Sequence, residues 1–194
     1  MRKLCCVPMI ALLFLTGCSG RANISEGEKL ALEIRSEFLA ASSCTAKAEV
    51  TADYGQRVYQ YSLDITASEE ETVLVLTQPD TVAGITARIM KETGWLEYDG
   101  LSVETGPLND EGLTPVSAVP TLLEAARSGY MTSCMLEEES GLLRVDCSDP
   151  EKVPGQGMEM TLWFDRNSHE LLRGEIMNDG IRVINCTFSQ FTKE

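Results

Sequence analysis

Cysteine thiols are the side chains in this sequence with the clearest capacity for chemistry, and Cys18 stands apart from the other six by its neighbours. It directly follows Leu15, Thr16 and Gly17 at the end of an apolar run. A thiol in that setting can be linked to diacylglycerol before a peptidase cleaves the chain ahead of it. Cys18 is therefore our candidate lipidation residue and the expected first residue of the mature chain.

The N-terminus has the organisation of an export signal. Arg2 and Lys3 form a positive segment, and the apolar run over 7–15 is too short to span a bilayer as a helix. With Cys18, it resembles the signal of bacterial lipoproteins; the alternative is an ordinary signal peptide with an incidental cysteine. We predict a signal peptide over 1–17, a lipidated N-terminus and tether over 18–24, and one domain over 25–194. The resemblance implies a protein anchored to the extracytoplasmic face of the cell membrane by several acyl chains, which together bind stably.

The chain is strongly acidic, with a formal net charge of −14. The predicted signal contains two of the 16 basic residues and none of the 30 acidic ones, which leaves −16 on the mature chain. Nucleic acid and anionic lipid headgroups are disfavoured as partners, so we expect membrane contact through the anchor alone. The glutamate runs at 69–71 and 137–139 lack the alternating ligands of a calcium loop and indicate solvated turns.

Residues for catalysis are sparse. His169 is the only histidine, and it follows Asn167 and Ser168 in a turn sequence where we expect an exposed side chain. No nucleophile elbow and no second histidine accompany it, and the glycines at 155 and 157 precede no helix that could cradle a phosphate. The sequence thus indicates a noncatalytic protein with no catalytic, metal or cofactor residue; a hydrolase that uses His169 is the alternative.

Two helices are expected to position the rest of the chain. Ser25 and Glu28 form a capping box ahead of Leu30, Ile34 and Phe38, whose four-residue spacing predicts an amphipathic helix over 26–41. A second helix is predicted over 120–128, with Pro120 in its first turn and Gly129 as its stop. We expect this helix to be a lid over the sheet, with Leu122 and Leu123 facing inward.

Alternation of apolar and polar residues predicts strands through most of the remaining chain. Asp99-Gly100 and Asp179-Gly180 are favoured two-residue hairpin turns, and the first pairs Tyr98 with Leu101 and Leu96 with Val103. The expected strands begin at Cys44, Tyr59, Thr72, Ile85, Leu96, Leu101, Tyr130, Leu142, Met158, Glu170 and Ile181. The predicted fold is α+β, a strongly curved antiparallel sheet of about ten or eleven strands forming an incomplete barrel with two helices.

This order of elements resembles the LolA/LolB superfamily of lipoprotein-sorting proteins, over nearly all of the mature chain. The residues at 44–50 and 79–84 are similar to lipid-anchored clostridial members related to the germination lipoprotein GerS. The superfamily resemblance implies helices over an apolar hollow that accepts acyl chains. The GerS-like resemblance implies partner binding instead, with an envelope amidase as the client.

Two functions follow from the resemblance. The chain is either a binding module for lipid or lipidated protein, or an accessory subunit that supports a cell-wall (cortex) amidase. The anchor at Cys18 argues against a soluble shuttle. The arginine by which carriers hold their lid cannot be assigned here: Arg57 and Arg88 both lie on plausible strands, where solvent-facing positions are the simpler interpretation.

A disulfide between Cys134 and Cys147 is predicted from register. If Ser140-Gly141 is a two-residue turn, Leu136 pairs with Val145 and Cys134 lies opposite Cys147. Two reduced cysteines are the alternative. Cys44 and Cys186 would remain, with nothing local to bring them together.

Overall fold

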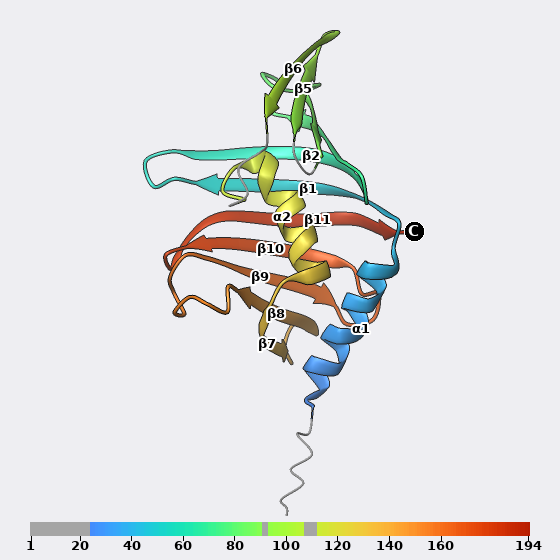
Figure 1. Cartoon of the computed structure of the whole chain (residues 1–194), viewed down its shortest axis with the longest axis vertical. Coiled ribbons are helices and arrows are strands. Elements are labelled where there is room, and N and C mark those ends of the chain that lie inside the picture. The colour runs from blue at the N-terminus through green and yellow to red at the C-terminus, as the bar shows by residue number, and fades with distance from the viewer. Residues whose placement is uncertain (1–23, 91–92, 107–111) are drawn as a thin grey trace, which may run out of the picture.

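The computed structural model describes residues 24–90, 93–106 and 112–194. Within them, the chain forms two helices and one eleven-stranded antiparallel sheet (Figure 1). The elements are α1 (Glu26–Ala40), β1 (Ser43–Asp53), β2 (Val58–Ser68), β3 (Thr72–Gln78), β4 (Thr86–Ile89), β5 (Gly94–Tyr98), β6 (Leu101–Gly106), α2 (Pro115–Ser128), β7 (Met131–Leu136), β8 (Leu142–Ser148), β9 (Met158–Asp165), β10 (Leu171–Asn178) and β11 (Ile181–Lys193).

The sheet is open, with β6 at one end and β7 at the other. Its strand order is β6-β5-β4-β3-β2-β1-β11-β10-β9-β8-β7, so each half is a meander and the halves join where β1 pairs with β11. The first and last strands of the chain therefore lie at the centre of the sheet. The predicted α+β fold with an incompletely closed antiparallel sheet is confirmed.

Helix α1 begins at the predicted capping box. The Ser25 hydroxyl accepts a bond of 3.1 Å from the Glu28 amide, and the Glu28 carboxylate accepts one of 2.7 Å from the Ser25 amide. Ile34 and Phe38 are buried on one face, as the spacing predicts, and Ala31 is buried beside them, whereas Leu30 of the predicted stripe is only partly buried. This face packs against α2, β7 and β8.

Helix α2 starts at Pro115, so the predicted start at Pro120 is wrong. Thr114 caps the helix, and its hydroxyl and that of Ser117 each accept a bond of 3.1 Å from the other residue's amide. Pro115 fits the first turn because the amide it lacks would have no helical partner there, whereas Pro120 lies inside the helix. The longer helix crosses the concave face over β1, β9, β10 and β11 (Figure 1).

Both predicted aspartate-glycine hairpins are confirmed. Tyr98 pairs with Leu101 and Leu96 with Val103, and the turn residues Asp99 and Gly100 have φ angles of 49° and 78°. Positive φ at both turn positions matches the twist of the adjoining strands. The turn at 179–180 has the same form and joins β10 to β11.

The β7–β8 register differs from the prediction, and the predicted disulfide is absent. The Glu137 amide bonds the Leu142 carbonyl at 2.9 Å, so four residues, not two, form the turn. Cys134 therefore lies opposite Val145, and Cys147 lies opposite Met131. Cys134 and Cys147 are free thiols, as are Cys44 and Cys186. The two residues added to the predicted turn are Glu138 and Glu139. Both are polar, so the longer turn exposes no apolar side chain.

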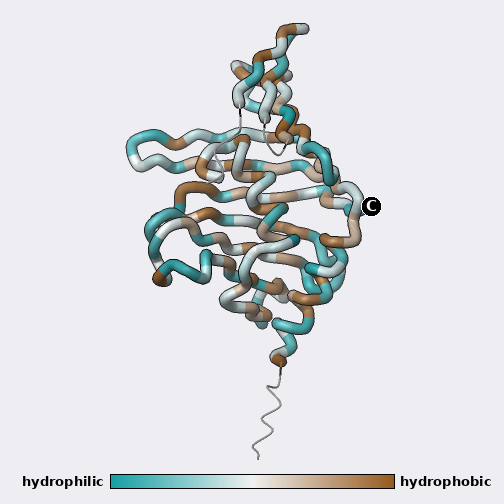
Figure 2. The backbone as a smooth tube through the Cα atoms, viewed as in Figure 1, coloured by the Kyte–Doolittle hydropathy of each residue, from teal (hydrophilic) through white to brown (hydrophobic). Residues whose placement is uncertain are grey.

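The core lies between the helices and the concave face of the sheet. Along β1 the inward positions are Cys44, Ala46, Ala48, Val50 and Ala52, all buried, while most of the intervening residues are exposed. Figure 2 shows apolar and polar stretches interleaved along the strands. Because most of these inward side chains are small, a helix can lie close above the central strands.

Candidate functional site

The concave face under α2 is tightly packed. Leu122 is fully buried and Leu123 is 6 % exposed, so both belong to the core. A Cβ placed on Gly174 of β10 would lie 2.6 Å from Leu122 Cδ1, which is closer than van der Waals contact. The leucine thus occupies the space that a side chain at 174 would take. Whether α2 moves as a lid stays a prediction.

Among the described residues, a cavity of about 10 Å³ lies between α1, α2 and strands β8 and β9. That volume holds about one water molecule, whereas small-molecule sites span about 300–1,000 Å³. Arg35 borders this cavity; its Nη2 donates a bond of 2.6 Å to the Gly129 carbonyl, and its buried Nε has no partner among the described residues. The polar guanidinium and the small volume both disfavour an acyl chain here.

A larger hollow of about 200 Å³ opens beside α2, against the β2–β3 turn and the end of β4. Leu123 and Met90 provide apolar surface, and Glu69, Glu70 and Glu124 provide carboxylates. An alkyl chain placed there would take water from charged groups, which costs free energy. The hollow is therefore poorly suited to lipid.

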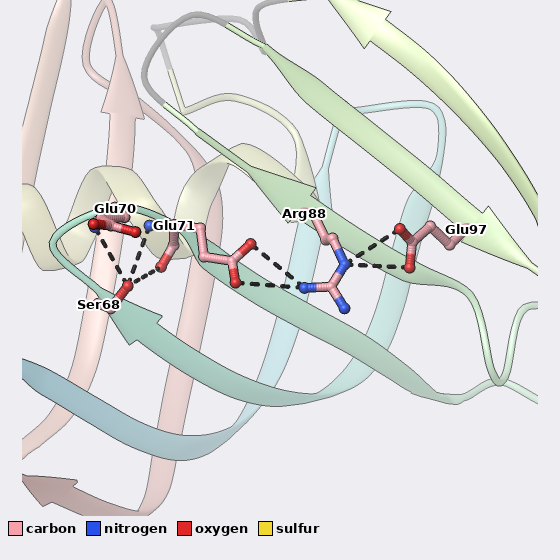
Figure 3. A network of polar contacts seen from close by, with 5 residues as sticks. All are labelled: Ser68, Glu70, Glu71, Arg88 and Glu97. Atoms are coloured by element: carbon pink, nitrogen blue, oxygen red, sulfur yellow. Dashed lines mark hydrogen bonds and ion pairs between the residues drawn. The ribbon is translucent and has the colours of Figure 1, made fainter.

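Beside this hollow, Arg88 of β4 pairs with Glu97 of β5 and with Glu71, which directly precedes β3 (Figure 3). Its Nε donates to both Glu97 oxygens at 3.2 Å, and its Nη1 donates to the Glu71 carboxylate at 3.4 Å. These bonds, chiefly that to Glu97, raise the pKa of Arg88. Arg88 thus lies on a strand, as expected, but pairs with carboxylates. Arg57 is exposed and precedes β2, so its predicted place on a strand is wrong.

His169 is not exposed, contrary to the prediction. Its side chain is 15 % exposed, and its Nδ1 lies 2.7 Å from Glu37 Oε1 on α1. Lys193 Nζ donates to Glu37 Oε2 at 2.7 Å and to the His169 carbonyl at 3.1 Å. Burial raises the pKa of Glu37, but the bonds from Lys193 and His169 outweigh it and lower the pKa overall. This cluster ties the last strand and the β9–β10 turn to α1.

Glu33 also lies beside this cluster. The ligand atoms of Glu33, Glu37 and His169 lie within 4.8 Å of one another. The Lys193 ammonium already neutralises Glu37 in this arrangement. The geometry therefore indicates an ion-pair cluster that fixes the C-terminal strand.

A group of adjoining, exposed apolar side chains lies on the β5–β6 hairpin. Its members are Leu96, Tyr98, Leu101 and Val103, which are 38, 57, 74 and 62 % exposed, and which we call the hairpin face. The register places all four on one side of the hairpin. Figure 1 shows that the hairpin projects beyond α2 at one end of the sheet, and Figure 2 shows apolar stretches on it.

Cys18, the predicted signal peptide and nearly all of the predicted tether lie outside the described residues. Among the residues that the structure describes, no helix combines the length and apolarity needed to cross a bilayer.

No family model matches the sequence, and no curated protein resembles it closely enough to count as a match. Solved structures do resemble it. A DUF1329 family protein from Desulfovibrio piger matches with a TM-score of 0.50 at 10 % identity, covering 88 % of this chain and 93 % of its own. A Vibrio parahaemolyticus domain assigned to outer membrane lipoprotein sorting matches with a TM-score of 0.50 at 12 % identity, covering 89 % and 94 %. The chain has a LolA-like fold.

A further similar structure is the GerS lipoprotein of Clostridioides difficile, solved in complex with the CwlD amidase. It matches with a TM-score of 0.48 at 14 % identity, covering 88 % of this chain and 97 % of its own. At such identities the likeness describes the LolA-like fold alone.

The hairpin face was missed as a candidate site by sequence reasoning, although its register was predicted. Alternation identifies which residues share a face but not whether another layer covers that face. The sequence signal that could have identified this face is the position of the hairpin along the chain. The helix that covers the central strands begins only after β6 has ended.

Proposed function

We propose that this chain is a noncatalytic, lipid-anchored protein of the cell envelope that binds a protein partner through the hairpin face. Cys18 carries the anchor at the extracytoplasmic face of the membrane, and the LolA-like domain presents its partner surface away from the packed helices. The fold supports a binding role, and Glu37, which contacts His169, is already paired with Lys193.

The contrast between two apolar surfaces carries this proposal. Under α2, Leu122 fills the space above Gly174, and the cavity that the described residues line between α1, α2, β8 and β9 is about 10 Å³. On the hairpin, Leu101 and Val103 are mostly exposed to water. Exposed apolar surface that another protein can cover is typical of interaction sites.

Binding of lipid or a lipidated protein is the competing function. A lipid site at the position of Leu122 would require α2 to lift from the sheet and expose this fully buried side chain, which removes about 1.5–3 kcal/mol of burial for that side chain alone. Partner binding requires no such change. The accessory-subunit hypothesis is compatible with the exposed hairpin, and a cell-wall amidase is the client class that it names.

Recovery of the full lipidated chain from its own membranes after mild cross-linking tests the proposal. We expect a protein partner in stoichiometric amount, and no lipid in the organic extract beyond the covalent anchor. Tyr98→Glu should release the partner because it places a charge on the hairpin face. Ile181→Glu is the matched control, since Ile181 is an exposed apolar residue on β11.

Stoichiometric noncovalent lipid without a protein partner would overturn partner binding in favour of lipid handling. Retention of the partner by Tyr98→Glu would show that the hairpin face is not the binding surface.

A further inference from the structure

Strand β6 has an open backbone edge. It is the last strand of the sheet, and among the described residues no strand pairs with its outer side. In a two-residue hairpin, the pair next to the turn is hydrogen-bonded and the pairs then alternate. Leu101 and Val103 therefore bond to β5, while the N–H and C=O groups of Ser102 and Glu104 point toward the open edge.

The two faces of this edge differ in chemistry. Leu101 and Val103 lie on the hairpin face, whereas Ser102 and Glu104 lie on the opposite face. All four side chains are exposed. The strand contains neither the proline nor the lysine that commonly protects edge strands from pairing. A strand added here would thus lie beside apolar side chains on one face of the sheet and beside polar side chains on the other.

The polar face is acidic. Arg88 neutralises Glu97, while among the described residues the Glu104 carboxylate accepts a bond of 3.0 Å from the Thr93 hydroxyl and has no cationic partner. The whole chain carries a net charge of −14. A second copy paired at this edge would bring like charges together, so a cationic partner is the complementary one.

We propose that β6 accepts an additional strand from a partner protein, an extended segment in which apolar residues alternate with lysine or arginine. Its apolar side chains cover Leu101 and Val103, and its cations face Glu104. Backbone bonds to Ser102 and Glu104 hold the segment, and the alternation selects it. This inference rests on the proposed function and specifies the chemistry of the partner.

The first test uses a defined probe and the full chain. A ten-residue peptide in which valine alternates with lysine is titrated by calorimetry, against a peptide of the same composition with the valines and lysines in two blocks. We expect the alternating peptide to bind at least tenfold more tightly, and to slow hydrogen exchange at Ser102 and Glu104. Equal affinity of the two peptides, or protection elsewhere than β6, would overturn strand addition.

Backbone methylation distinguishes strand addition from simple side-chain contact. An added strand donates to β6 only through alternate residues, which are the lysines if the strands are antiparallel and the valines if they are parallel. Methylation of one set of peptide nitrogens should abolish binding, and methylation of the other set should leave it within about threefold. Equal effects of the two sets would contradict the proposal.

Variants of the full chain complete the test. Val103→Lys and Glu104→Lys should each weaken the alternating peptide at least tenfold, while Ile181→Lys, at an exposed site on another strand, should bind it like the wild type. Unchanged binding by both β6 variants would overturn the proposal. Self-association of the chain that Val103→Lys abolishes, without peptide binding, would assign the edge to a second copy instead.

Failure of strand addition and failure of the proposed function give different results. If membranes yield a partner that Tyr98→Glu releases but the alternating peptide does not bind, strand addition is wrong and partner binding stands. If membranes yield noncovalent lipid and no protein partner, the proposed function is wrong regardless of what the peptide does.

Discussion

Leu122 of α2 packs directly onto Gly174 of β10. A Cβ at position 174 would lie 2.6 Å from Cδ1 and 2.8 Å from Cδ2 of the leucine, which is itself fully buried. The absence of a side chain at 174 thus lets the helix lie against the sheet, with Leu122 filling the space between them.

Gly174→Ala should destabilise the protein by about 1–3 kcal/mol, because the added methyl group overpacks the contact with the fully buried Leu122. Leu122→Ala should cost about 2–5 kcal/mol through loss of burial. The double variant should be less destabilised than the sum of the two, because the alanine at 122 makes room for the methyl group. Urea unfolding measures all three, and additive free energies would contradict direct packing.

The capping of α2 offers a second measurement. Thr114→Ala should lower the free energy of unfolding by about 0.5–2 kcal/mol, because the Ser117 amide loses its acceptor. Thr114→Ser retains a hydroxyl and serves as the control. Equal stability of the alanine and serine variants would show that the helix does not begin at Pro115.

Acid stability should depend on Glu37. Its folded-state pKa lies below the ordinary 4.5, so the stabilisation is present above that value and is lost as the pH falls through the folded-state pKa. Glu37→Gln should therefore show a smaller loss of stability than the wild type between about pH 6 and pH 3. Lys193→Met should change the slope in the same direction, because Lys193 is one of the groups that lower the pKa. Urea titrations across this range measure the free energy of unfolding at each pH. Identical slopes of that free energy against pH for all three proteins would contradict the prediction.

The cysteines should be recovered as thiols from the mature lipidated protein. Burial raises the pKa of Cys147 to about 11 and that of Cys186 to about 12, so little reactive thiolate exists at neutral pH. We expect iodoacetamide to label Cys134 first in the native state, since it is only half-buried. Unfolding without reductant should expose Cys44, Cys134, Cys147 and Cys186. A Cys134–Cys147 peptide in a nonreducing map would contradict the observed β7–β8 register.

Lipid attachment should depend on Cys18 alone. Cys18→Ala should abolish incorporation of labelled palmitate and release the chain from the membrane after any cleavage, because the acyl chains supply the membrane affinity. Cys6→Ala, within the predicted signal peptide, is the control and should remain labelled. Label retained by Cys18→Ala would move the anchor to another residue.

Local sequence determined the features that depend on neighbouring residues. The Ser25 and Glu28 cap, the stripe that buries Ile34 and Phe38, and both aspartate-glycine turns were predictable, because each is fixed by residues within about one turn of helix or one hairpin. The antiparallel α+β class followed from the alternation of apolar and polar residues along most of the chain.

Tertiary structure decided the features that depend on distant segments. Two contacts join residues far apart in sequence: Leu122 with Gly174, and His169 with Glu37. The exposure of Leu101 and Val103 likewise depends on where distant segments lie. The apolar residues on one face of an alternating strand look the same in the sequence whether that face packs a core, lines a hollow or meets water. Only the path of α2, which covers the central strands and leaves β5 and β6 beyond its reach, distinguishes these outcomes.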